Sequence, residues 1–185
     1  MNRNLFALVA PIALAASIIL PAAARAQAPA PRPDDVATPE AIVDAAYAAI
    51  ARAPGEPFQW DRFRSLFLPG ARLVPNTEQT GGAFRVLTPE EFITWIDGFS
   101  DGVIGTPDDQ GFEETGVHAV VERYGDIAHV MSTYEKHLWG DDEILGRGIN
   151  SFQLVHNGGR WWIAGIVWDE ENGAGPVPPR YRPGR

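Results

Sequence analysis

The sequence predicts an α+β domain in which helices lie on one face of a curved antiparallel sheet. Segments with a helical spacing of apolar residues come first and long strand-like segments follow, without the alternation of a βαβ fold. Short links join the four strand-like segments, and the last link, Asn157-Gly158-Gly159, is a strong hairpin signal. The strand-like segments are long, about thirteen residues at roughly 3.3 Å each. Long strands twist and bend, so we expect the sheet to wrap around the helices and leave a conical interior.

The first 26 residues have the features of an export signal. Arg3 supplies a basic start, residues 5–20 are almost entirely apolar, and Ala24-Arg25-Ala26 fits the small-x-small cleavage pattern. The apolar run is shorter than the roughly 20 residues of a membrane-spanning helix. We therefore expect cleavage after Ala26, a periplasmic or secreted protein, and no membrane contact after the signal is removed.

The composition narrows the class of partner. The chain of 185 residues has 15 Lys and Arg against 24 Asp and Glu, a formal net charge of −9, and no cysteine. Such an acidic chain repels phosphate backbones, so we expect no nucleic-acid partner. Disulfides, thiol chemistry and thiolate metal sites are excluded because there is no cysteine.

The mature chain has the length of one domain, which we place at residues 38–171. Residues 27–37 are rich in proline and are predicted to be an extended linker. Residues 172–185 contain several glycines and prolines and are predicted to be a disordered tail.

Three helices are predicted at the start of the domain. Their residue ranges are 38–52, 59–67 and 88–102. The first begins at Thr38-Pro39-Glu40 and the third at Thr88-Pro89-Glu90-Glu91, where Thr can cap the helix, Pro suits its first position and Glu favours its positive end. Trp95 lies on the apolar stripe of the third helix.

Six strands are predicted, and the last four form an antiparallel meander. Their ranges are 71–74, 83–87, 112–124, 126–138, 144–156 and 160–169. Regular alternation places Glu114 and His118 on one face of the strand over residues 112–124. The sequence leaves open which face of the sheet lines the interior.

Two parts of this layout resemble the nuclear transport factor 2-like superfamily, which includes SnoaL-like cyclases, ketosteroid isomerase and scytalone dehydratase. The segment 124–135 resembles the turn that enters a central strand in that group, and 147–154 with 160–169 resembles the two closing strands of bacterial members. The resemblance implies a cystatin-like cone with a pocket between sheet and helices. It also implies a homodimer as one expected assembly, because members often dimerise through the open sheet face. It implies no particular reaction, and no catalytic residues of the family can be placed on this chain.

The sharpest site hypothesis groups polar residues of neighbouring strands. Its catalytic candidates are His118, Glu114 and Tyr134, and its ligand-binding candidates are Tyr134, Asn150, Trp168 and Trp95. A buried histidine beside a carboxylate can act as a general base near neutral pH, and tyrosine and asparagine can hold a carbonyl oxygen. The alternative is that Glu114 and His118 are solvated on the outer face and that Tyr134 is a core residue.

We expect no metal and no cofactor. His129 and His137 are eight residues apart on one strand, roughly 26 Å, too far for one ion. The acidic group Asp169-Glu170-Glu171 lacks the spacing of a calcium loop and is interpreted as solvated turn charges. No phosphate loop, nucleophile elbow or dinucleotide motif is present.

Three functions fit these features. The first is an exported domain that binds a small apolar molecule. The second is an enzyme that carries out acid–base chemistry on a small carbonyl or polycyclic substrate. The third is a dimerisation or interaction module.

Overall fold

The computed structural model describes residues 29–98 and 110–184 and confirms the predicted α+β class. The export signal predicted over residues 1–26 and the predicted end of the third helix at Gly102 lie outside the described residues. Among the helices in the described ranges, none is long and apolar enough to span a bilayer.

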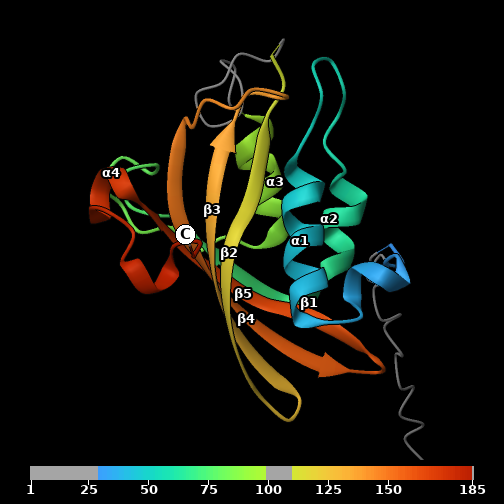
Figure 1. Ribbon diagram of the computed structural model, residues 1–185. Helices are drawn as coiled ribbons and strands as arrows, with labels where there is room; N and C mark the ends of the chain where they lie inside the picture. Colours follow the sequence, from blue (N-terminus) through green and yellow to red (C-terminus); the bar gives the residue numbers. More distant parts are fainter. Residues whose placement is uncertain (1–28, 99–109, 185) are drawn as a thin grey trace, which may run out of the picture.

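Five strands form one strongly curved sheet in the order β1-β5-β4-β3-β2 (Figure 1). The predicted meander is present as four antiparallel strands: β2 (Glu113–Tyr124), β3 (Ile127–His137), β4 (Gly146–Asn157) and β5 (Arg160–Glu170). An additional edge strand, β1 (Phe67–Val74), pairs in parallel with β5.

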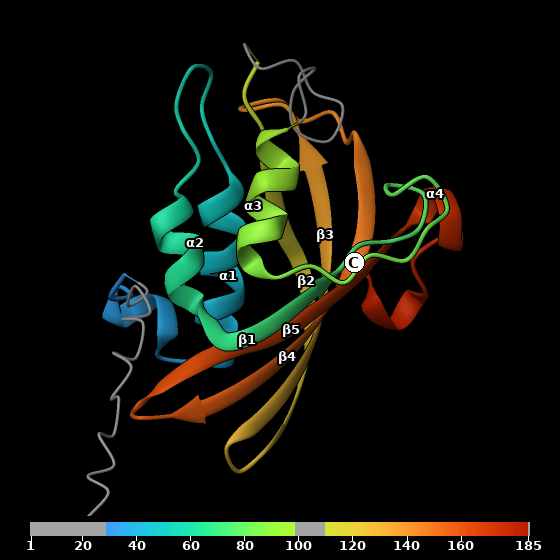
Figure 2. The ribbon, with the colours of Figure 1, turned by 180° about the vertical axis from the view of Figure 1, so that it is seen from behind.

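Three helices lie against the concave face of the sheet, as Figures 1 and 2 show from opposite sides. They are α1 (Pro39–Ile50), α2 (Trp60–Leu66) and α3 (Pro89–Asp97). The Thr38 hydroxyl accepts a hydrogen bond from the amide of Ala41, and Thr88 forms a reciprocal capping box with Glu91. The helix starts predicted at the two Thr-Pro-Glu segments are therefore confirmed.

The strand predicted over residues 83–87 does not form. Among the described residues, that segment contributes a single bridge to the sheet, between Leu87 and Leu73. Leu87 packs against the core, but Phe84 and Val86 are exposed, so the segment lacks the continuous apolar face that would hold a longer strand on the sheet.

Two segments predicted to lack regular structure contain short helices, because each makes specific tertiary contacts. Within residues 27–37, the 3-10 helix η1 (Pro33–Val36) carries Asp35, which accepts two hydrogen bonds of 2.8 Å from the guanidinium of Arg62. Beyond the sheet, α4 (Glu171–Ala174) and the 3-10 helix η3 (Pro179–Tyr181) flank Val177, which is 3% exposed.

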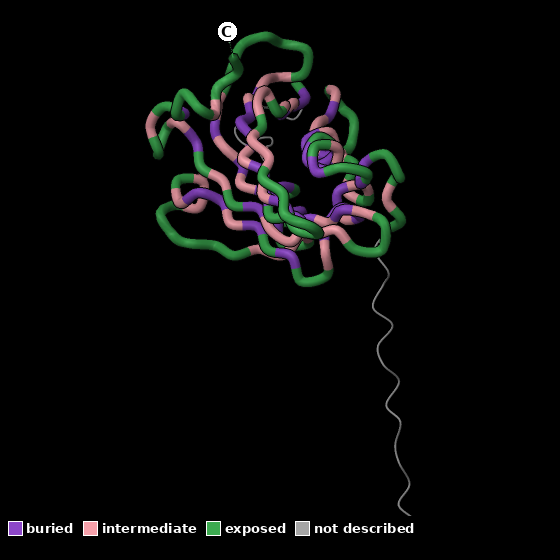
Figure 3. Tube along the Cα trace, turned by 60° about the horizontal axis from the view of Figure 1, so that its bottom comes forward, coloured by how far each residue is buried: buried purple, intermediate pink, exposed green. Residues whose placement is uncertain are grey.

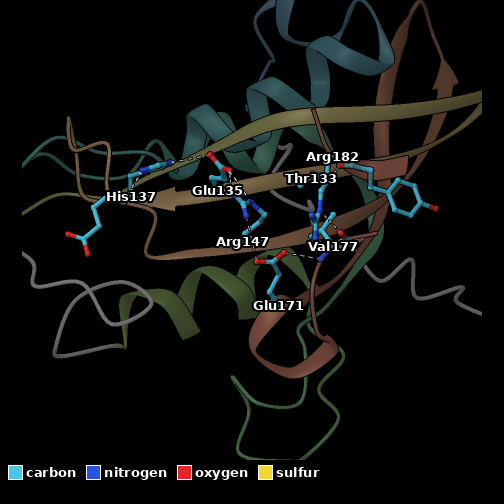
Figure 4. A network of polar contacts seen from close by, with 9 residues as sticks. Thr133, Glu135, His137, Arg147, Glu171, Val177 and Arg182 are labelled. Carbon is cyan, nitrogen blue, oxygen red and sulfur yellow. Dashed lines mark hydrogen bonds and ion pairs between the residues drawn. The ribbon is translucent and has the colours of Figure 1, made fainter. Parts of the chain in front are cut away.

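The tail from α4 onward lies on the side of the sheet opposite to α1–α3 (Figures 1 and 2). A chain of polar contacts holds it there (Figure 4). The Thr133 hydroxyl donates to the carbonyl of Tyr181, the Arg182 guanidinium to the carbonyl of Val177, and the amide of Val177 to the carboxylate of Glu171.

The apolar core fills the space between the concave face and the helices, where Figure 3 shows the buried segments of both layers. Cross-strand partners lie on the same face of a sheet, so Val130, Phe152 and Ile166 form one row across β3, β4 and β5. Phe63 of α2 stacks on Phe92 of α3, with ring centroids 5.4 Å apart. This packing fixes the helices over the sheet and leaves room at one end.

Candidate functional site

A cavity of about 260 Å³ lies between the concave face of the sheet and the helices. Most of its wall is apolar and aromatic. These residues are Ala46, Tyr47, Ile50, Phe63, Leu73, Phe92, Trp95, Ile96, Phe152, Ile166 and Trp168. The remaining lining residues are polar and come from the strands and the loop after β1: Gln79, Glu114, Tyr134, Asn150 and Glu170.

The strand register decides which side chains face this cavity. Glu114 pairs with Lys136 and Gly116 pairs with Tyr134, so Glu114 lies on the same face as Tyr134. A bulge then shifts the register between Gly116 and His118, and His118 pairs with Thr133. Thr133 contacts the tail on the outer side, so His118 lies on the face away from the cavity.

The predicted association of His118 with Glu114 is therefore wrong. Regular alternation fails at the bulge, because an extra residue reverses the direction of every side chain that follows. The other predicted site residues, Glu114, Tyr134, Asn150, Trp168 and Trp95, all line the cavity. The alternative interpretation is wrong for Glu114, which is buried in the cavity wall, whereas His118 lies on the outer face and Tyr134 is a buried core residue that also lines the cavity.

Glu114 is a deeply buried carboxyl of the cavity wall, with 8% of its surface exposed. One of its oxygens accepts a hydrogen bond of 3.2 Å from the side-chain amide of Asn150. The same amide donates to the hydroxyl of Tyr47, which donates in turn to Ser132 at 2.8 Å. These contacts join α1, β2, β3 and β4 at the inner end of the cavity.

Burial raises the pKa of Glu114 to about 7. Desolvation is the main cause, and the nearby charge of Glu170 adds to it. The charge of Lys136 and the hydrogen bond from Asn150 lower the pKa and offset part of this effect. Glu114 can consequently hold or release a proton near neutral pH.

Glu170 is the second buried carboxyl of the cavity, and one of its oxygens is the acceptor for three donors. The ammonium of Lys136 lies 2.6 Å away, the amide of Gln79 2.8 Å and the hydroxyl of Tyr134 3.1 Å. Trp168 donates its indole N–H to the side-chain oxygen of Gln79 at 2.8 Å. Gln79 therefore connects the indole ring of Trp168 to the ion pair of Glu170 and Lys136.

Four residues of this arrangement were not predicted from the sequence: Tyr47, Gln79, Lys136 and Glu170. The interpretation of Asp169-Glu170-Glu171 as solvated turn charges is wrong for Glu170, which is 7% exposed and pairs with Lys136. The sequence feature that could have indicated this cluster is the pair of glycines at positions 146 and 148 of β4. A Cβ at Gly146 would lie 2.5 Å from Lys136, and one at Gly148 would lie 2.6 Å from the Tyr134 hydroxyl, so glycine at both positions makes room for the cluster.

No group of His, Asp and Glu side chains suited to a metal ion occurs in the described ranges. His137, which the sequence analysis considered for a metal, lies on the outer face beside Glu135 and Arg147 (Figure 4). Its ring nitrogen is 3.8 Å from the carboxylate of Glu135, which also binds Arg147. This cluster belongs to the contacts that surround the tail.

Comparison with known proteins identifies the fold. No protein-family model and no curated protein matches the chain. A solved structure from Xanthomonas campestris, a candidate calcium/calmodulin dependent protein kinase II association domain, has a TM-score of 0.50 and 16% identity and is matched over 71% of this chain and 84% of its own.

Two further solved structures have similar shapes. An NTF-2 like protein of unknown function from Silicibacter pomeroyi has a TM-score of 0.49 and 19% identity over 71% of this chain and 91% of its own. A candidate ketosteroid isomerase from Parabacteroides distasonis has a TM-score of 0.47 and 17% identity over 77% of this chain and 89% of its own. Identities this low concern the fold and do not assign an activity. With its helices packed in a curved four-strand meander, the chain has a cystatin-like cone fold, which it shares with the solved structure from Xanthomonas campestris.

Proposed function

We propose that this protein is an exported binding protein for a small, largely apolar molecule that carries one polar group. The observation that supports this function best is the cavity itself, in which an aromatic wall ends in a small cluster of polar side chains. The export signal predicted over residues 1–26 supports the location outside the cytoplasm.

Binding is tested with N-phenyl-1-naphthylamine, a neutral probe whose fluorescence rises in apolar surroundings. We expect a saturable rise with the native protein. The variants Ala46→Leu and Ile96→Phe place extra atoms in the cavity from α1 and α3 and should weaken binding at least about tenfold.

The matched control is Val167→Leu, which adds an apolar group at a position that is 52% exposed and outside the cavity lining. Circular dichroism checks that each variant is folded. Equal probe binding by the native protein and both folded cavity variants would contradict the proposal.

A second candidate function is proton transfer to or from a bound carbonyl compound, with Glu114 as the acid or base. The observation that favours it is a cavity-lining carboxyl whose pKa is raised to about 7. The test is the rate at which 2-tetralone exchanges its α-protons for deuterium, followed by NMR. A rate that rises through pH 7 and is lost in Glu114→Gln supports catalysis, and a rate equal to that of buffer excludes it for this substrate class.

A further inference from the structure

The hydrogen-bond donors at the polar end of the cavity are already engaged by acceptors of the protein itself. They are the hydroxyls of Tyr47 and Tyr134, the amides of Gln79 and Asn150, and the indole of Trp168. A ligand that takes a donor from either hydroxyl, the indole or the Asn150 amide would have to break one of these buried bonds, which leaves an acceptor unpaired at a cost of about 1–3 kcal/mol.

Two carboxylate oxygens at this end of the cavity, in contrast, have no hydrogen-bond partner among the described residues. Glu114 uses its Oε1 to accept from Asn150, and its Oε2 has no hydrogen-bond partner among the described residues. Glu170 accepts all three of its donors on Oε1, and its Oε2 likewise has none within the described part of the chain. The oxygens left open at this end can accept hydrogen bonds from a ligand.

The charges at this end do not cancel. The charged side chains among the described lining residues are Glu114 and Glu170, both acidic. Lys136 bonds directly to Glu170, and their side chains are 8% and 9% exposed. No described cation lies within ion-pair distance of Glu114. When Glu114 is ionised, the charge of Lys136 stabilises it only from beyond ion-pair distance, and a cation in the cavity in direct contact with it would offset more of the cost of burial.

The rest of the wall also suits a cation that carries an apolar body. Phe63, Phe92, Trp95 and Trp168 place aromatic rings around the space, and Phe92 meets Trp168 edge to face at 6.0 Å. Aromatic faces attract ammonium groups as well as apolar surface. The net charge of −9 favours the approach of cations over that of anions.

We propose that the ligand of this cavity is an apolar amine whose ammonium group donates a hydrogen bond to Glu114 Oε2 while its hydrocarbon body packs against the aromatic wall. This inference rests on the proposed binding function and names its ligand class. A cavity of about 260 Å³ limits the amine to a small ring system or a short chain.

The affinity for the amine should depend on pH, because the charge of Glu114 changes near neutral pH. The polar groups that face Glu114 are Tyr47 of α1, Tyr134 and Lys136 of β3, Asn150 of β4 and Glu170 of β5. A bound ammonium adds a positive charge, which favours ionised Glu114 and lowers its pKa. An aliphatic amine has a pKa of about 10, so it stays protonated from pH 5.5 to 8. Binding should therefore tighten as Glu114 ionises over that interval.

The test uses three probes of similar shape: 2-phenylethylamine, 2-phenylethanol and 3-phenylpropionate, which are cationic, neutral and anionic. Affinities are measured by isothermal titration calorimetry at pH 5.5 and 8. We expect the amine to bind at least about tenfold more tightly than the alcohol at pH 8, the worth of one charge-assisted hydrogen bond, and the acid to bind most weakly. The preference for the amine should shrink at pH 5.5.

Glu114→Gln keeps an acceptor for Asn150 and removes the charge, so it should abolish the preference for the amine. The matched control Glu113→Gln removes a carboxylate from the neighbouring residue, which points to the other face of β2 and should keep the preference. Equal or tighter binding of the alcohol by the native protein overturns the amine proposal.

A lack of binding by all three probes also overturns it, and N-phenyl-1-naphthylamine then separates two cases. If that neutral probe still binds in the cavity, the proposed binding function stands without the amine class. If it does not bind, the proposed function fails as well.

Discussion

At the scale of the residue, the surroundings of Glu114 change the pKa of its carboxyl group. Its carboxyl group would titrate near pH 4.5 in water, and burial between α1 and the sheet raises its pKa to about 7. The hydrogen bond from Asn150 keeps it oriented toward the cavity. The burial that raises this pKa also reduces the stability of the fold when the group is charged.

The stability of the protein should consequently depend on pH through Glu114. Between pH 4.5 and 7 the folded state keeps a proton that the unfolded chain has lost, so the free energy of unfolding falls as pH rises through this interval. From pH 5 to 8 the loss should be about 2.5 kcal/mol, measured by urea denaturation. Glu114→Gln should remove this part of the pH dependence and Glu113→Gln should not. An unchanged dependence in Glu114→Gln would show that another group is responsible.

At the scale of the element, β-bulges decide which residues meet in the cavity. The bulge between Gly116 and His118 turns His118 outward and leaves Glu114 and Gly116 facing in. Another register shift occurs between Gln153 and Leu154 in the pairing of β4 with β5. Bulges bend strands and increase their twist, so the features that curve the sheet around the helices also select the residues of the site.

His118 should therefore make little difference to ligand binding. The variant His118→Gln should change the affinity for N-phenyl-1-naphthylamine by less than about twofold, because its side chain lies on the face opposite to the cavity. The measurement is the same fluorescence titration as above. A loss of tenfold or more in a folded His118→Gln variant would place this side chain in the cavity and contradict the register.

At the scale of the whole molecule, the C-terminal segment completes the sheet's outer side. Residues 171–184 follow β5 directly, and Figure 4 shows how Glu171, Val177 and Arg182 are linked to one another next to Glu135 and Arg147. Val177 is buried although the segment is rich in glycine and proline. The tail is thus part of the fold and covers a portion of the outer face of β2 and β3.

Removal of apolar surface from this segment should cost stability. Val177→Ala deletes two buried methyl groups and should lower the free energy of unfolding by about 1.5 kcal/mol. The control Val86→Ala makes the same change at a position that is 61% exposed and should have almost no effect. Urea denaturation at constant pH measures both. Equal values for the two variants would mean that the tail does not pack on the domain.

Local patterns in the sequence determined the elements and their order. The Thr-Pro-Glu segments mark where α1 and α3 begin, since capping and a fixed proline φ act within one turn. The Asn157-Gly158-Gly159 link marks the hairpin between β4 and β5, since glycine at φ +64° and +79° suits the turn. Alternation within β3 and β4 also placed Tyr134 and Asn150 correctly on their strands.

Contacts between strands, and not local patterns, select the polar residues that form the site. Glu170 and Lys136 are far apart in the sequence and look like ordinary surface charges, and they become a buried pair because β3 and β5 both face the cavity on either side of β4. His118 and Glu114 look like partners and are separated by one extra residue in a strand. Capping and turn signals act over a few neighbouring residues, whereas register, bulges and burial depend on pairings across the whole sheet.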